Sequence, residues 1–299
     1  MKCLVTGGAG FIGSNLALEL ESKGHEVIAA DNFLTGSKEN LNGFKGKLLN
    51  IDVSKPFEIK EHLDAIFHEA AITDPRFNDD KEMLRANLDG FKNVIALARK
   101  NNAKLVYAST ANLYGNGKTP MQEDQKKDIF CAYGSSKLMM DELASLLFQK
   151  MHIVGLRYFN VFGPREAAKG KAASMVLHLL NQIKDDKNPR IFKFGEQKRD
   201  HIYVKDCVTA TIKALHARSG IYNVGTGIAT SFNELVNVLN ELLGKNLKPE
   251  YIDMPYDPKT YQADTQADTK KAEEQLGFKS EFDLKDGIMD YMLWLGENR

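Results

Sequence analysis

A run of glycines directly after the first apolar segment constrains the fold more than any other feature of the sequence. Lys2–Thr6 is short and apolar, and glycine follows at Gly7, Gly10 and Gly13, with the spacing G-x-x-G-x-x-G. The next segment, Phe11–Lys23, has a helical pattern. Glycine permits a tight turn and a close approach of the backbone, and the N-terminus of the following helix offers free N–H groups. This order of elements predicts a turn that binds the pyrophosphate of a dinucleotide.

An acidic residue lies at the distance that such a turn requires. Asp31 ends the second predicted strand, Glu26–Asp31, where a carboxylate can accept hydrogen bonds from a ribose. Because a carboxylate repels a 2′-phosphate, Asp31 favours NAD as the cofactor. Lys38 follows closely and would tolerate that phosphate, so NADP stays open as the alternative.

Short β-rich runs alternate with longer helical patterns in the first half of the chain. We expect strands at Lys2–Thr6, Glu26–Asp31, Lys47–Asp52, Ala65–His68, Lys104–Ser109 and His152–Arg157. We expect helices at Phe11–Lys23, Arg76–Lys100 and Ile129–Lys150. Such alternation is typical of an α/β fold in which helices cover both faces of a parallel sheet. The sequence therefore predicts a Rossmann-type, doubly wound parallel sheet.

The pattern changes after Gly163 and Pro164, where strand signals become short and scattered. We expect strands at Pro189–Phe194, His201–Val204, Ile221–Val224 and Pro249–Ile252, and helices at Ala172–Lys184, Lys205–Ala217, Phe232–Leu243 and Lys285–Leu295. This pattern predicts a smaller C-terminal α/β substrate domain that is interleaved with the first. We assign residues 1–163 and about 201–226 to the dinucleotide-binding domain, and about 164–200 and 227–299 to the substrate domain.

The composition excludes several classes of partner. Basic and acidic residues number 40 each, so no long-range field attracts nucleic acid or an acidic membrane. No apolar run approaches the roughly 18 residues that suggest a membrane span, and the N-terminus does not resemble a signal peptide. Cys3, Cys131 and Cys207 are few and widely separated, without zinc-ligand spacing. We expect a cytoplasmic protein with reduced thiols and no metal site.

A tyrosine and a lysine supply candidate acid–base groups. Tyr133 and Lys137 are four residues apart in a predicted helix and hence on one face of it. A neighbouring ammonium favours the phenolate of a tyrosine, whose ordinary pKa is about 10. Ser109 and Thr110 end the strand upstream, and ligands bind at the C-terminal ends of strands in such sheets. We therefore expect Thr110 to hold a reacting oxygen while the tyrosinate takes its proton.

Further segments extend these motifs into a family resemblance. They are His68–Ala71, Asn87, Arg157–Pro164, Arg199-Asp200 and Tyr222–Gly227. With them the chain resembles the extended short-chain dehydrogenase/reductase family over essentially its whole length. The resemblance implies a small-molecule nucleotide-sugar substrate, and a homo-oligomer that pairs through the predicted helices Arg76–Lys100 and Ile129–Lys150.

The resemblance also implies the roles of particular residues. Those implied to bind the cofactor are Gly7, Gly10, Phe11, Ile12, Gly13, Asp31, Asn32, Lys38, Asp52, Val53, Ala70, Ala71, Asn87, Ser109, Tyr133 and Lys137. Those implied to bind the substrate are Thr110, Asn160, Lys169, Ser174, His178, Phe194, Arg199 and Tyr261. Asn160 and Arg199 would hold the diphosphate, although a surface ion pair between Arg199 and Asp200 is the alternative for that arginine.

Within the family, the segments Arg157–Leu179, Lys198–Val204 and Tyr261–Asp268 are most similar to members that epimerise carbon six of an ADP-linked heptose. The resemblance implies that Lys169 is a second acid–base group. An exocyclic ketone can present its other face by bond rotation, which moves its oxygen away from the first proton donor. Lys169 would then supply the second proton; the alternative is an exposed loop lysine.

Three other functions would use part of these motifs. A UDP-hexose 4-epimerase would share Thr110, Tyr133 and Lys137, but it would give Lys169 no proton to transfer. A 4,6-dehydratase needs an acid–base carboxylate pair after the threonine, where this chain has Ala111 and Asn112. A non-catalytic dinucleotide sensor would not need both the tyrosine and the lysine.

Overall fold

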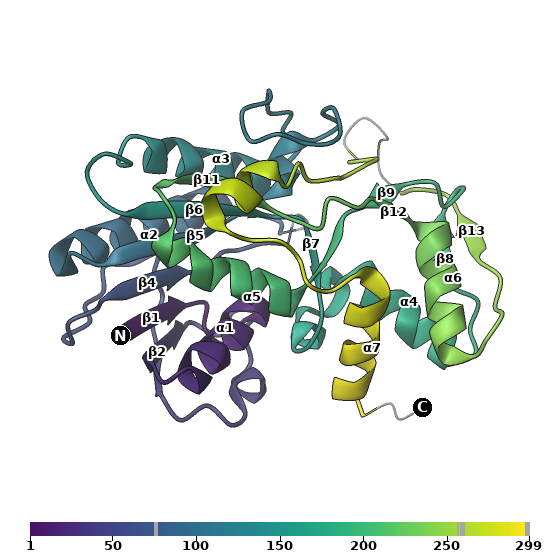
Figure 1. Ribbon diagram of the computed structural model, residues 1–299, viewed down its shortest axis with the longest axis horizontal. Coiled ribbons are helices and arrows are strands. Elements are labelled where there is room, and N and C mark those ends of the chain that lie inside the picture. The colour runs from purple at the N-terminus through teal and green to yellow at the C-terminus, as the bar shows by residue number, and fades with distance from the viewer. Residues whose placement is uncertain (75–76, 256, 258–260, 297–299) are drawn as a thin grey trace.

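A seven-stranded parallel sheet forms the centre of the larger part of the molecule (Figure 1). The computed structural model describes residues 1–74, 77–255, 257 and 261–296. The strands are β1 (Lys2–Thr6), β2 (Glu26–Asp31), β3 (Lys47–Asn50), β4 (Ala65–His68), β5 (Lys104–Thr110), β6 (Ile153–Tyr158) and β11 (Gly220–Val224). Their order is β11-β6-β5-β4-β1-β2-β3, so the chain reverses its direction of travel across the sheet between β1 and β4. Ligands bind at such a switch point in doubly wound folds.

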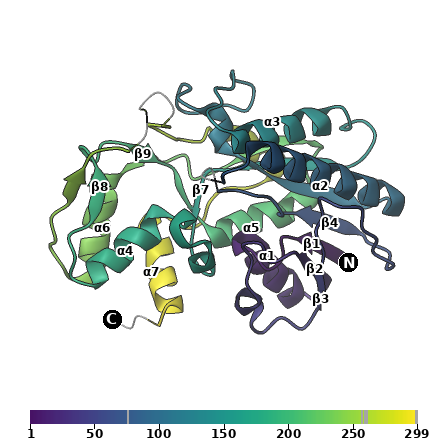
Figure 2. The same ribbon diagram turned by 180° about the vertical axis from the view of Figure 1, so that it is seen from behind.

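Helices cover both faces of this sheet (Figure 2). They are α1 (Phe11–Ser22), α2 (Asp80–Asn101), α3 (Ala132–Ser145) and α5 (Val204–Lys213). Successive side chains of a strand point to opposite faces. In β1, Cys3 and Val5 join a core with Leu16 of α1 and Val208 of α5, whereas Leu4 faces the core of α2 and α3. The predicted Rossmann-type fold is therefore confirmed.

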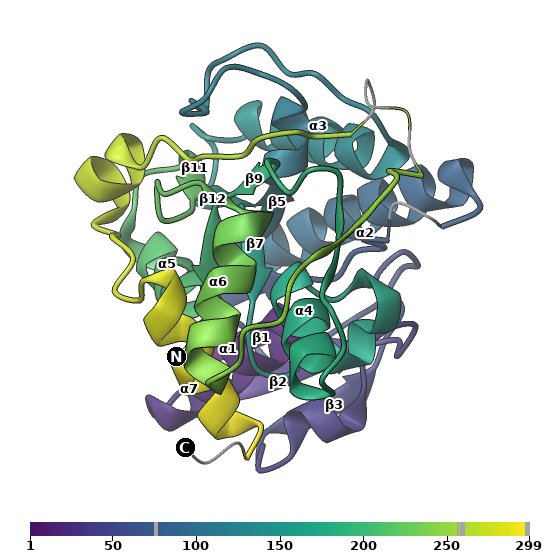
Figure 3. The same ribbon diagram turned by 90° about the vertical axis from the view of Figure 1, so that its right-hand side faces the viewer.

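The remaining elements form a smaller region beside the C-terminal edge of the sheet (Figure 3). Its helices are α4 (Met175–Lys184), α6 (Phe232–Leu243) and α7 (Leu284–Trp294). Its strands form three pairs, which are β7 (Asn160–Phe162) with β10 (His201–Tyr203), β9 (Lys198–Arg199) with β12 (Thr230–Ser231), and β8 (Arg190–Phe192) with β13 (Glu250–Ile252). The chain returns from this region to the large sheet through α5 and β11, and the domain limits given above stay a prediction.

Caps explain where several helices begin later than expected. The Asp79 side chain accepts a hydrogen bond from the Glu82 N–H, so α2 begins at Asp80. Arg76, the expected start of that helix, lies outside the described residues. Ser174 caps α4 in the same way, so that helix begins at Met175 rather than at Ala172. The strands β7, β9 and β12 have only two or three residues each, too few to show a period in the sequence.

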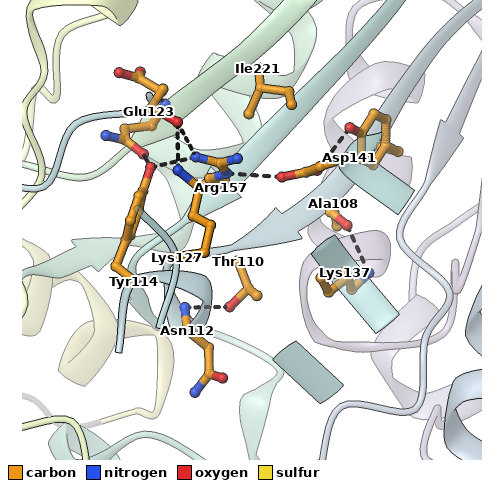
Figure 4. Close-up of polar contacts among 12 residues, drawn as sticks. Ala108, Thr110, Asn112, Tyr114, Glu123, Lys127, Lys137, Asp141, Arg157 and Ile221 are labelled. Atoms are coloured by element: carbon orange, nitrogen blue, oxygen red, sulfur yellow. Dashed lines mark hydrogen bonds and ion pairs between the residues drawn. The ribbon is translucent and has the colours of Figure 1, made fainter. Parts of the chain in front are cut away.

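A buried ion pair joins the sheet to α3 (Figure 4). Arg157 of β6 donates through Nε to the Asp141 carboxylate at 2.9 Å, and Asp141 also accepts a hydrogen bond from the Tyr107 hydroxyl at 2.9 Å. Arg157 donates further to the Tyr114 hydroxyl and the Glu123 carbonyl, at 2.9 and 2.8 Å. The pair fixes α3 against β5 and β6.

Replacement of Asp141 by Ala should destabilise the protein by about 3–5 kcal/mol, because it leaves the Arg157 guanidinium buried without its carboxylate. Urea unfolding would measure the loss. Glu58→Ala, which removes an exposed ion pair with Lys100, is the control and should leave the unfolding midpoint unchanged. Equal midpoints for Asp141→Ala and the wild-type protein would contradict this interpretation.

Candidate active site

The glycine turn between β1 and α1 has no room for side chains. Gly7 has a φ of 67°, and a Cβ there would lie 2.6 Å from the Ala70 nitrogen. A Cβ at Gly13 would lie 2.1 Å from the Gly7 carbonyl oxygen. The Gly10 N–H donates to that same oxygen at 2.9 Å. The turn therefore offers bare backbone at the N-terminus of α1, which fits the pyrophosphate of a dinucleotide.

Asp31 lies against this turn. Its carboxylate is buried and accepts hydrogen bonds from the Ala9 N–H at 3.0 Å and the Phe33 N–H at 2.8 Å. Asn32 is exposed, and its side-chain oxygen accepts from the Leu34 N–H. The Lys38 amine lies 5.6 Å from the centre of the Phe33 ring. The acid expected at the ribose is thus fixed beside the glycines.

Most of the other residues expected at the cofactor lie at or just after the ends of the strands, and Asn87 lies on a helix. The half-buried Asp52 and Val53 follow β3, and Ala70 and Ala71 follow β4; Ala70 packs against Gly7. The Ser109 hydroxyl is buried and has no hydrogen-bond partner among the described residues. Asn87 is different, because its amide already bonds both backbone groups of Ile72 and the Ser136 hydroxyl. These bonds connect the segment after β4 to α3.

Thr110, Tyr133 and Lys137 come together as the sequence predicts. The Thr110 side chain lies near enough to the Tyr133 hydroxyl to lower its pKa by hydrogen bonding. The Lys137 amine, with 1% of the residue exposed, donates to the Ala108 carbonyl at 2.7 Å and lies 5.9 Å from the centre of the Tyr133 ring. Figure 4 shows Lys137 beside the end of β5, with Thr110 on the same strand.

The ionisation of this pair differs from the expectation. Burial raises the pKa of Tyr133 to about 12, and the hydrogen bond from Thr110 only partly opposes it. Burial likewise lowers the pKa of Lys137 to about 8. We expected the ammonium to hold the phenol below its ordinary pKa. Protein groups alone do not do so, because desolvation dominates and the nearby Glu69 carboxylate raises the pKa of the phenol further.

Lys169 lies on a turn of 3₁₀ helix, η3 (Glu166–Ala172). Its amine is 5.6 Å from the centre of the ring of Phe11, the first residue of α1, and burial lowers its pKa. The residue is half-buried rather than an exposed loop lysine. Ser174, which is expected at the substrate, bonds the buried Glu166 carboxylate and caps α4.

Arg199 is buried but does not pair with Asp200. Its guanidinium donates to the Lys198 and Ala263 carbonyls at 2.8 Å, and lies 5.1 Å from the centre of the Tyr261 ring. The Asp200 carboxylate accepts instead from backbone N–H groups of residues 226, 227 and 267. The alternative of a surface ion pair is therefore wrong.

Three further residues expected at the substrate belong to the smaller region of the molecule. The Asn160 side-chain oxygen accepts from the Thr265 hydroxyl at 2.9 Å. His178 is half-buried on α4. Phe194 is 67% exposed, with its ring 6.0 Å from that of Tyr251. The structure does not bring these three side chains into contact with Tyr133 or Lys137.

Glu69 is a candidate that sequence reasoning did not single out. Burial raises the pKa of its carboxyl to about 7, against the opposing charge of Lys137. One oxygen accepts from the Tyr158 hydroxyl at 3.2 Å, and the other is buried without a partner in the described part of the chain. The sequence feature that could have identified Glu69 is its charge directly after the apolar strand Ala65–His68.

The described residues contain no group of three or more His, Cys, Asp or Glu side chains placed to hold a metal ion. No helix within residues 1–74, 77–255 and 261–296 is long and apolar enough to cross a membrane.

Substitution of Gly13 by Ala should abolish dinucleotide binding, because its Cβ would collide with the Gly7 carbonyl oxygen and deform the turn. Calorimetric titration with NAD would measure the affinity. Gly220→Ala is the matched control, since its nearest neighbours are 3.4 Å away, and it should bind NAD like the wild-type protein. Retained affinity in Gly13→Ala would refute the proposed cradle.

Binding of oxidised dinucleotide should lower the pKa of Tyr133 from about 12 toward neutrality, because a positively charged ring favours the phenolate. Ultraviolet difference titration of the protein with and without NAD, each compared with Tyr133→Phe, would isolate this one tyrosine. An unchanged titration curve on binding would show that Tyr133 does not face the ring.

Comparisons with known proteins agree with this geometry. The profile of the NAD dependent epimerase/dehydratase family matches residues 3–225. An ADP-L-glycero-D-manno-heptose-6-epimerase of Brachyspira hyodysenteriae is 37% identical over 305 residues, covering 96% of both chains. The crystal structure of the Helicobacter pylori enzyme of the same name is 38% identical, with a TM-score of 0.93 over 99% of this chain and 96% of that one.

The fold is also shared with epimerases of other sugars. A UDP-glucose 4-epimerase of Thermotoga maritima, solved with UDP-glucose, is 26% identical, with a TM-score of 0.90 over 99% of each chain. A UDP-glucose 4-epimerase of Thermus thermophilus, solved with NAD, is 27% identical, with a TM-score of 0.83 over 96% of each chain. The glycine turn, the Thr110–Tyr133–Lys137 cluster and the match over residues 3–225 agree: the chain belongs to the NAD-dependent epimerase/dehydratase family.

Proposed function

We propose that this protein epimerises carbon six of ADP-D-glycero-D-manno-heptose. The observation that carries the proposal is the position of Lys169, half-buried against Phe11 at the start of α1 and with a lowered pKa. A second proton-transfer group beside the dinucleotide turn suits inversion at a carbon outside the sugar ring, because the rotated ketone oxygen points away from the first group. The likeness to two heptose epimerases, over 96% or more of this chain, supports the same substrate.

The residues divide the proton transfers between them. The bound dinucleotide supplies the transient oxidation and re-reduction of one substrate carbon. Tyr133, hydrogen-bonded to Thr110, accepts the proton of the substrate hydroxyl at one face. Rotation about the exocyclic bond then turns the ketone oxygen away from Tyr133. Lys169 returns a proton to that oxygen, which completes the inversion.

Asp31 favours NAD over NADP in this proposal. Both carboxylate oxygens already accept backbone N–H groups, so the charge is held beside the expected ribose. A 2′-phosphate there would meet the repulsion of a fixed negative charge. The nearby Lys38 amine lies over the Phe33 ring.

A UDP-hexose 4-epimerase is the second candidate, favoured by the fold shared with the Thermotoga maritima enzyme. Ring inversion needs one tyrosine only, because the whole sugar can turn over. This function would leave the half-buried position of Lys169 beside Phe11 without a chemical reason.

As to assembly, we propose a homo-oligomer paired through α2 and α3, where Met139 is 42% exposed.

Substitution of Lys169 by Ala should abolish turnover of the ADP-heptose while NAD affinity is retained, because the second proton donor is lost and the glycine turn is not. Product analysis by NMR, together with NAD titration, would measure both. Lys171→Ala, which removes an exposed lysine from the same loop, should turn over normally. Full turnover by Lys169→Ala would refute the two-group mechanism.

A further inference from the structure

The loop that bears Lys169 is closed at its base by a buried carboxylate. One Glu166 oxygen accepts hydrogen bonds from the Gly163 N–H at 3.0 Å and the Ser174 hydroxyl at 2.9 Å, and the other accepts from the Ser174 N–H at 2.6 Å. These bonds join the two ends of the loop. They fix its width, but they do not attach it to the dinucleotide turn.

Arg165 makes that attachment. Its guanidinium donates through Nε to the Asn40 carbonyl at 3.0 Å and through Nη1 to the Asn15 side-chain oxygen at 2.8 Å. It also lies 5.7 Å from the centre of the Trp294 ring of α7. Arg165 directly precedes the loop and has a φ of 73°. This left-handed backbone conformation is uncommon for residues other than glycine.

Both partners of Arg165 are themselves bonded to the turn. The Asn40 amide donates to the Ala9 carbonyl at 3.0 Å. The Asn15 amide donates to the carbonyls of Phe11 and Pro164, each at 2.9 Å. Phe11 is also the residue whose ring lies beneath the Lys169 amine. A closed ring of contacts thus runs from the dinucleotide turn through Arg165 to Lys169 and back.

We propose that Arg165 is a positioning residue that holds the Lys169 loop in register with the dinucleotide turn. The inference rests on the proposed function, in which Lys169 transfers the second proton. Because a bound dinucleotide is fixed by the same turn, the fork of Arg165 sets the place of the Lys169 amine relative to the reacting carbon. A misplacement of about 1 Å at a reacting group can cost roughly 100-fold in rate.

The test uses Arg165→Gly and Arg165→Asn, because both residues accept a left-handed backbone and remove only the fork. The assay is single-turnover oxidation of each carbon-six epimer of the ADP-heptose, followed by the absorbance of reduced nicotinamide. In the two-group mechanism, Tyr133 assists oxidation of one epimer and Lys169 assists that of the other. Tyr133→Phe and Lys169→Ala identify which epimer depends on which group.

Both Arg165 variants should slow oxidation of the Lys169-dependent epimer by about 10- to 100-fold and leave the other epimer and NAD affinity unchanged. Lys171→Ala is the control and should leave both rates unchanged. A merely structural role would slow both epimers alike, and that result, or no effect on either, would overturn the proposal while the function of Lys169 stands. If Lys169→Ala slowed neither epimer, the proposed function would fail, and the role of Arg165 with it.

Discussion

The buried amine of Lys137 is the contact on which the arrangement of the site depends. It donates to the Ala108 carbonyl near the end of β5, and thereby fixes α3, with Tyr133 one turn earlier, against the C-terminal edge of the sheet. The Arg157–Asp141 ion pair holds the next turn of the same helix to β6. Two buried cations thus fix one helix to adjacent strands, so the phenol and the Thr110 hydroxyl meet without help from a flexible loop.

Burial of these groups has a chemical consequence. Desolvation raises the pKa of the Tyr133 phenol and lowers that of the Lys137 ammonium. The protein by itself therefore favours the uncharged form of both groups. A positively charged ring stacked at the site would reverse this balance for the phenol. The enzyme would then generate its base only when the oxidised cofactor is bound, which limits proton transfer in its absence.

Much of the large sheet could be predicted from the sequence, because each strand there is a short apolar run bounded by turn residues. The bounds of β1, β2 and β4 agree with prediction, and the Tyr133–Lys137 spacing places both groups on one face of α3. The contacts of Asn87, Ser174 and Arg165 could not be predicted, because their partners lie 15, 8 and more than 100 residues away in the sequence. The helical and strand periodicity of the sequence does not indicate contacts of this kind. Glu69 was missed because a charge at a strand end is ordinarily solvated.

The central claim is inversion at an exocyclic carbon, and the most direct measurement is NMR of the products formed from ADP-D-glycero-D-manno-heptose and from UDP-glucose. If Lys169 serves as the second proton donor, the heptose is inverted at carbon six and UDP-glucose is returned unchanged. Inversion of UDP-glucose at carbon four, with no change in the heptose, would contradict it.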